Sequence, residues 1–139
     1  MKLFILSILF LVCTPVLAGD INLELIGCIS GKDVRVALYS SPSGFSEDRE
    51  GKNALHTQVV KAERGNMTLS FTDLPAGKYA IAAFVDSNGN HKLDSNFLGM
   101  PIEPYGFSRD ARNSFKKPSF EDAAFEVGNE NVAQVIHLK

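Results

Sequence analysis

The run Lys78–Val85 sets the strongest limit on how this chain can fold. It reads K-Y-A-I-A-A-F-V, in which aromatic and β-branched residues are separated by alanines. A run that is apolar on both sides is typical of a strand buried on both faces of a sheet. Pro75 and Gly77 stand just before it, and their L-P-A-G pattern predicts a turn that joins it to the preceding strand as a hairpin. The sequence therefore predicts a central β-strand at this place.

Short segments in which apolar and polar residues alternate recur through the rest of the chain. They predict further strands at Ile21–Ile26, Val34–Tyr39, Thr57–Ala62, Met67–Phe71 and Val132–Leu138. The turn-forming residues I-S-G-K-D between the first two predict that those two strands pair as a hairpin.

Two other segments lack this alternation. Ser40–Lys52 has no sustained apolar period and reads as a surface loop from which Phe45 could turn inward. Pro118–Val127 could begin as a short helix capped by Ser119 and Asp122, or it could be extended.

About seven strands, separated by turns and without a long helical period, predict an all-β chain. We expect a single antiparallel β-sandwich of immunoglobulin-like or transthyretin-like type, formed by residues 19–139. Cys13 would leave with an N-terminal leader, so Cys28 would remain as a single cysteine and no internal disulfide could form. It reads as a small buried apolar residue.

The first 18 residues predict a signal peptide for export. Lys2 gives a basic start, Leu3–Cys13 is apolar throughout, and Val16 and Ala18 place small residues three and one before a cleavage site. The apolar run is shorter than the roughly 20 residues of a membrane-spanning helix. We expect a mature chain that begins at Gly19, has no transmembrane anchor and is periplasmic or secreted. The formal net charge of −2 argues against nucleic acid as a partner.

The segment after the central strand carries oxygen-bearing side chains at regular spacing. In D-S-N-G-N-H-K-L-D, such side chains occupy positions one, three, five and nine, and Lys92 at position seven would offer its backbone carbonyl. Ca²⁺ is bound by hard oxygen donors that one short loop can supply. The sequence predicts a weak calcium site, with a dissociation constant of roughly 10⁻⁴–10⁻³ M. Its ligands would be Asp86, Asn88, Asn90, Lys92 and Asp94. The alternative is a metal-free turn whose side chains accept hydrogen bonds from their own backbone amides.

This loop is not a strict EF-hand. His91 stands where an EF-hand has its glycine, and Phe97 stands where it has its bidentate glutamate. The pattern is closer to the D-x-[DN]-G-[DN]-x-x-x-D loops between strands of other extracellular β-domains.

Asn96–Ser108 is apolar but interrupted by two glycines and two prolines, which excludes a regular helix and a central strand. It could form an aromatic-lined ligand surface, or a lid that closes one end of the sandwich. The basic residues that follow could hold an anionic group or form a solvated loop. The residues of the possible ligand surface are Phe97, Glu103, Tyr105, Phe107, Arg109 and Arg112.

Four segments of the chain resemble one bacterial family. They are L-P-A-G-K-Y-A, F-V-D-S-N-G-N-H-K-L-D-S-N-F-L-G-M-P, E-P-Y-G-F-S and P-S-F-E-D-A-A-F. These segments are similar to the secreted proteins catalogued as domain of unknown function 2141. The resemblance implies an exported single β-domain without an established activity. The first turn and strand also resemble carboxypeptidase regulatory-like and transthyretin-like modules, a likeness that concerns fold alone.

We predict an exported binding or structural module in which the Asp86–Asp94 loop binds Ca²⁺ and fixes the aromatic loop beside it. Its partner would be a protein, a glycan or a small molecule. One alternative is a hydrolase that uses carboxylates among Glu103, Glu121 and Asp122 on an extracellular or periplasmic substrate. Another is a cell-surface assembly component, which an exposed apolar patch at residues 97–107 would favour.

Overall fold

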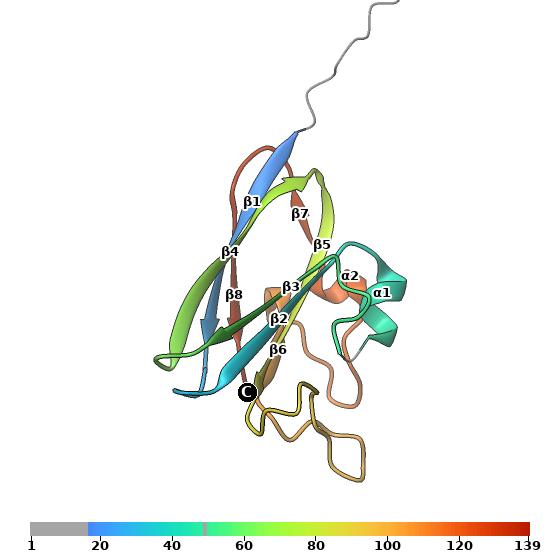
Figure 1. Cartoon of the computed structure of the whole chain (residues 1–139). Coiled ribbons are helices and arrows are strands. Elements are labelled where there is room, and N and C mark those ends of the chain that lie inside the picture. The colour runs from blue at the N-terminus through green and yellow to red at the C-terminus, as the bar shows by residue number, and fades with distance from the viewer. Residues whose placement is uncertain (1–16, 49) are drawn as a thin grey trace, which may run out of the picture.

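The computed structural model describes residues 17–48 and 50–139, so most of the predicted leader lies outside the described residues. This part of the chain holds eight strands and three short helices (Figure 1). In chain order they are β1 (Ala18–Ile26), β2 (Asp33–Tyr39), α1 (Pro42–Glu47), β3 (His56–Lys61), β4 (Asn66–Pro75), β5 (Gly77–Asp86), β6 (Tyr105–Phe107), η1 (Ser108–Asp110), α2 (Phe120–Ala123), β7 (Phe125–Val127) and β8 (Val132–His137). Within these residues, no helix is long and apolar enough to cross a bilayer.

The strands form two sheets, which confirms the predicted all-β class. The smaller sheet has the order β4–β1–β8, and the larger has the order β3–β2–β5–β6 with β7 on the other end of β5. The prediction of a wholly antiparallel arrangement is wrong, because β1 and β8 run parallel with Ile21 opposite Val132. A parallel neighbour requires a long crossover connection. Here that connection contains all strands of the larger sheet together with β4.

Both predicted hairpins are wrong because the chain changes sheets at each turn. β1 and β2 lie in different sheets, and the amides of Gly27 and Cys28 donate to the Gly65 carbonyl at 2.8 and 2.9 Å instead of continuing a ladder. β4 ends at Pro75 and β5 begins at Gly77, yet β4 pairs with β1 and β5 pairs with β2. The turn residues mark where the chain reverses but carry no information about which sheet the next strand joins.

β5 is the central strand of the larger sheet, as predicted. It pairs with β2 along one edge and with β6 and β7 along the other. Its inward side chains and those of β1, β2 and β8 build the main core between the two sheets. Nearly fully buried members of this core include Ile21, Leu23, Leu25, Val34, Val36, Leu38, Ile81, Val85 and Ile136. Burial of this apolar surface, at about 25 cal/mol per Å², is the main source of stability.

A second core covers part of the outer face of the larger sheet. Phe45 of α1 is fully buried there and meets the rings of Tyr39, Phe107 and Phe120 edge to face, with centroids 5.4, 5.7 and 6.0 Å away. α1 is capped by Ser41, whose Oγ accepts a hydrogen bond from the Gly44 amide at 3.3 Å. The predicted loop is therefore helical at residues 42–47, although Phe45 does turn inward.

The segment from Pro118 contains both of the elements that its sequence left open. Ser119 Oγ accepts from the Asp122 amide at 3.1 Å, and Asp122 Oδ2 accepts from the Ser119 amide at 3.1 Å. This capping box starts α2, and the chain then becomes extended as β7. The helix places Phe120 in the second core.

Candidate functional site

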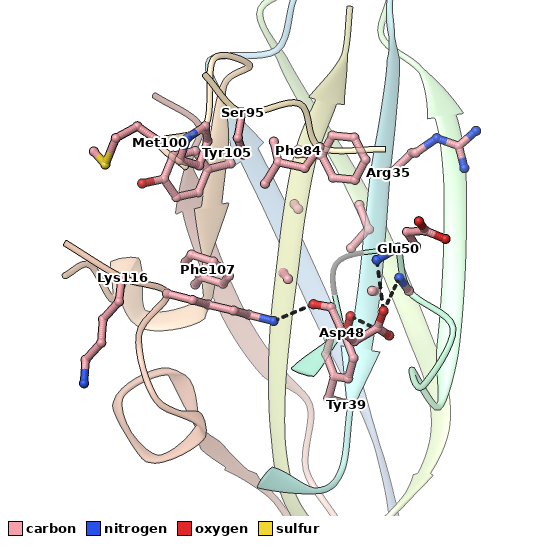
Figure 2. A pocket seen from close by; sticks show the side chains of 18 of the residues that line it. Arg35, Tyr39, Asp48, Glu50, Phe84, Ser95, Met100, Tyr105, Phe107 and Lys116 are labelled. Atoms are coloured by element: carbon pink, nitrogen blue, oxygen red, sulfur yellow. Dashed lines mark hydrogen bonds between the residues drawn. The ribbon is translucent and has the colours of Figure 1, made fainter. Parts of the chain in front are cut away.

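A pocket of about 560 Å³ lies on the outer face of the larger sheet, beside the second core (Figure 2). Ala37 of β2 and Ala82 of β5 line it and stand opposite each other in the strand register. Because each side chain is only a methyl group, the outer face of the sheet is recessed at this point. The paired alanines form the floor of the pocket.

Aromatic side chains from three strands surround this floor. Phe84 of β5 lies opposite Tyr105 of β6, and Phe107 of β6 lies opposite Ala82. The rings of Tyr105 and Phe107 are 5.8 Å apart at an angle of 72°. Figure 2 shows Phe84, Tyr105 and Phe107 on the same side of the sheet, with Tyr39 at the other end of the pocket. The lining is more apolar than polar.

Asp48 holds the loop that borders the pocket next to α1. Its side chain is buried, and its two oxygens accept hydrogen bonds from the amides of Glu50, Gly51 and Asn53 at 2.7–2.9 Å. Burial alone would raise the pKa of this carboxyl, but the backbone amides outweigh burial and hold the pKa below its ordinary value. Asp48 is therefore an ionised anchor for this wall.

Tyr39 completes the same network from β2. Its hydroxyl donates to Asp48 Oδ2 at 3.3 Å. Burial, followed by the adjacent Asp48 charge and this hydrogen bond, raises the pKa of the Tyr39 hydroxyl well above its ordinary value. The Tyr39 phenol therefore stays neutral and serves as a fixed donor.

Lys117 joins the 113–117 loop to α1. Its ammonium group donates to the carbonyl oxygens of Phe45 and Asp48, and it lies 4.2 Å from the centroid of the Phe45 ring. Such a cation over an aromatic ring gains electrostatic attraction from the ring face. The contact fixes one wall of the pocket against the second core.

The predicted calcium loop begins with an Asp86 carboxylate that already has partners. Asp86 Oδ2 accepts from Arg35 Nε at 3.0 Å and from the His91 amide at 3.0 Å, while Oδ1 accepts from the Gly89 amide at 2.8 Å. Burial opposes ionisation, but the Arg35 hydrogen bond and the two amides lower the pKa of Asp86. Both oxygens thus stabilise the curl of the loop.

The other side chains of this loop converge on Asp94. Asn88 Nδ2 donates to Asp94 Oδ2 at 2.6 Å, and Asn90 Nδ2 donates to both Asp94 oxygens at 2.9 and 2.8 Å. The oxygens of the two asparagines accept from the amides of Asn90 and Lys92, as in the metal-free alternative. His91 has a φ of 69°, so the chain curls at the position where an EF-hand has its glycine.

This arrangement provides an incomplete fit to Ca²⁺. The side chains gather at one place, but Asp86 shares its oxygens with Arg35 and two amides, and the asparagines turn nitrogen toward Asp94. Among residues 17–48 and 50–139, no three His, Cys, Asp or Glu side chains lie where they could jointly hold a metal ion. The calcium site stays a prediction.

The structure separates the predicted ligand-surface residues into four groups. Tyr105 and Phe107 line the pocket. Glu103 is buried below the loop, where its oxygens accept from the amides of Ser87 at 2.7 Å and Asp94 at 3.1 Å. Phe97 is 95% exposed.

The two arginines of that prediction hold the backbone beside the pocket. Arg109 donates to the Ala124 carbonyl at 3.3 Å. Arg112 donates to the carbonyls of Tyr105 and His137 at 3.1 and 2.9 Å, and its guanidinium lies over the Tyr105 ring at 5.3 Å.

The floor of the pocket and the wall on β5 were not predicted from the sequence. Ala37, Ala82 and Phe84 point outward from strands that were predicted. The alternating alanines of β5 were a visible signal, but only the register between β2 and β5 shows that Ala37 and Ala82 stand together.

The fold and the pocket define a small all-β protein with a ligand-sized hollow on the outer face of one sheet. The chain belongs to a bacterial family described as "uncharacterized protein conserved in bacteria (DUF2141)", whose family model matches residues 29–135. This match confirms the resemblance and includes the strands and loops around the pocket. No curated protein and no solved structure matches the chain significantly.

Proposed function

We propose that this chain is an exported binding module that holds a small, largely apolar ligand in the pocket over Ala37 and Ala82. The observation that carries the proposal is the pocket itself, whose volume of about 560 Å³ suits a small molecule. Ligand sites are usually concave, mostly apolar and about 300–1,000 Å³ in volume. A floor of two methyl groups ringed by Phe84, Tyr105 and Phe107 suits a flat apolar or aromatic body.

The wall of the pocket next to α1 is fixed before any ligand arrives. Asp48 is bound by three amides and Tyr39, and Lys117 ties the neighbouring loop to α1. Binding to such a preformed site loses less conformational entropy than binding that must order its own walls. This rigidity favours a binding role for the hollow.

A titration with the uncharged aromatic probe N-phenyl-1-naphthylamine tests the proposal. The probe should bind the wild-type protein, and Ala82→Leu or Ala37→Leu should weaken binding by at least about tenfold, because added methylenes fill the floor. Ala133→Leu, on an exposed position of β8, is the matched control and should bind as the wild type does. Equal affinity in all four proteins, each with an unchanged melting temperature, would overturn the proposal.

We also propose a supporting role for the Asp86–Asp94 loop, which is to bind Ca²⁺ weakly and thereby order the adjoining wall of residues 93–101. The observation that favours it is that the side chains of Asn88, Asn90 and Asp94 lie together, so that Ca²⁺ at Asp94 would have to replace the Nδ2 hydrogen bonds of the two asparagines by contacts with their oxygens. Two of these partners are neutral amides, which agrees with weak affinity. Melting with and without calcium, described in the Discussion, tests this role.

The carboxylates of the hydrolase alternative have structural partners. Glu103 binds two loop amides, Asp122 caps α2, and Glu121 lies 3.3 Å from Lys78. We therefore propose binding rather than hydrolysis. The immunoglobulin-like or transthyretin-like type of the two-sheet fold remains part of this proposal.

A further inference from the structure

Two loops beside the pocket carry large apolar side chains that are exposed to solvent. Phe97 is 95% exposed and Phe115 is 90% exposed, and Leu98, Ile102 and Met100 are 72, 66 and 43% exposed. Of the other phenylalanines in the described part of the chain, Phe84 is half-buried at the pocket and the rest are packed in the two cores. A group of exposed apolar side chains on a small protein marks an interaction surface.

The two loops lie close together. Leu98 and Met100 from one loop and Phe115 from the other line the same pocket. Figure 1 shows the first of these segments beyond the end of β5 that carries Asp86, away from the β4–β5 turn, and the second lies beside α1, where Lys117 contacts Phe45 and Asp48. We call them the apolar loops and define them as residues 92–102 and 111–117.

Hydrogen bonds hold the first apolar loop in its projecting shape. The Asn96 amide donates to the Met100 carbonyl at 2.8 Å, and Asn96 Oδ1 accepts from the amides of Leu98 and Met100 at 2.9 and 3.1 Å. Ser95 and Pro101 form an isolated antiparallel bridge at its base. These hydrogen bonds fix the turn that contains Phe97, and the Phe97 side chain is directed away from the cores.

The charge of the apolar loops is opposite to that of the whole chain. They hold four basic residues, Lys92, Arg112, Lys116 and Lys117, and one acidic residue, Asp94, whereas the chain has a formal net charge of −2. Lys92 and Lys116 are exposed. Basic side chains near exposed aromatic and aliphatic ones match the chemistry of an anionic lipid surface.

We propose that the apolar loops dock on an anionic lipid surface. Phe97, Leu98 and Phe115 enter the interface between headgroups and acyl chains, and Lys92 and Lys116 lie at the level of the phosphates. The size of the surface favours lipid over a protein partner, since a stable protein interface uses about 20–30 residues a side. A few inserted side chains together with basic residues suffice for peripheral membrane binding. This docking does not depend on ligand binding in the pocket.

Tryptophan fluorescence gives a site-specific test, because the chain contains no Trp. Phe97→Trp and Phe115→Trp each introduce one reporter, and Ala76→Trp is the matched control at the opposite end of β5, on the turn between β4 and β5. The protein is used as isolated from cells that express the complete sequence. It is mixed with vesicles of phosphatidylglycerol and phosphatidylcholine, or of phosphatidylcholine alone.

With phosphatidylglycerol vesicles, the emission of the two loop reporters should shift to the blue and be quenched by brominated acyl chains. The Ala76→Trp emission should not change. Lys116→Gln, combined with a loop reporter, should weaken vesicle binding by about fivefold. Unchanged emission of both loop reporters would overturn the proposal. A blue shift that grows with protein concentration in the absence of vesicles would also overturn it, because a second copy would then cover the loops.

Discussion

Arg35 on β2 and Asp86 at the end of β5 form an ion pair of 3.0 Å in which the carboxylate side chain is fully buried and the arginine side chain is 22% exposed. The pair joins the sheet to the start of the loop that borders the pocket. The same carboxylate also binds the amides of Gly89 and His91. One side chain thus sets the position of the loop on the larger sheet.

Replacing Asp86 by Asn should destabilise the protein. The amide keeps the shape of the carboxylate but removes its charge and one of its acceptor atoms, so a buried hydrogen bond is lost at a cost of about 1–3 kcal/mol. The free energy of unfolding from urea denaturation measures this loss. If the ion pair with Arg35 accounts for this loss, Asp86→Asn should lower the free energy of unfolding much less in an Arg35→Gln background. Equal costs in the two backgrounds would assign the effect to the loop amides.

Stability should fall as the pH approaches and passes below the ordinary carboxyl pKa, because the pKa values of Asp48 and Asp86 are lower in the folded protein than their ordinary values. A carboxyl with a lowered folded pKa contributes its stability above the unfolded value, about 3.9, and loses it as pH falls through the folded pKa. Urea denaturation between pH 7 and pH 3 should show this decline. Asp48→Asn should reduce the decline, and an unchanged pH dependence in that variant would contradict the role given to Asp48.

Calcium should raise the melting temperature if the Asp86–Asp94 loop binds it. At a hundredfold excess of Ca²⁺ over the dissociation constant, the gain is about 2.7 kcal/mol. Asp94→Ala should abolish the rise, since Asn88 and Asn90 converge on this carboxylate. Asp73→Ala, on an exposed part of β4, is the control and should keep the rise. Identical wild-type melts in calcium and in chelator would reject the site.

Gly106→Ala should destabilise the contact between the two sheets. A Cβ atom at this position of β6 would lie 2.5 Å from Ile136 Cγ2 and 2.8 Å from the His137 carbonyl oxygen. Overpacking of this kind costs about 1–3 kcal/mol. Gly65→Ala is the matched control, because its added methyl group would meet nothing closer than 3.8 Å. Thermal melts of the two variants compare the sites, and equal melting temperatures would show that β6 can shift away.

Local patterns in the sequence predict the parts of the fold that depend on neighbouring residues. The alternation in Lys78–Val85 places β5 to within one residue at each end. Ser119 and Asp122 predict the cap of α2 because both partners lie within one turn. The six residues of α1 are too few to show a helical period, so that helix was not predicted.

The features that were not predicted depend on pairing between distant segments. Nothing in I-S-G-K-D shows that β1 joins β4 and β8 while β2 joins the other sheet. The pocket needs the register that places Ala37 opposite Ala82. In the calcium loop the sequence shows which oxygens are available, but the partners of Asp86 include Arg35, which is 51 residues away.

The parallel pairing of β1 with β8 has a consequence for how the chain acquires its structure. β1 lies in the middle of its sheet and is synthesised before β8, so Ile21 must wait for Val132, more than a hundred positions later. Contacts so distant along the chain slow the search for the native arrangement. The smaller sheet can therefore be completed only after β8 has been synthesised. A circular permutant that joins the end of β8 to the start of β1 should refold faster, and because the two strands are parallel its linker must be a crossover of about a dozen residues or more.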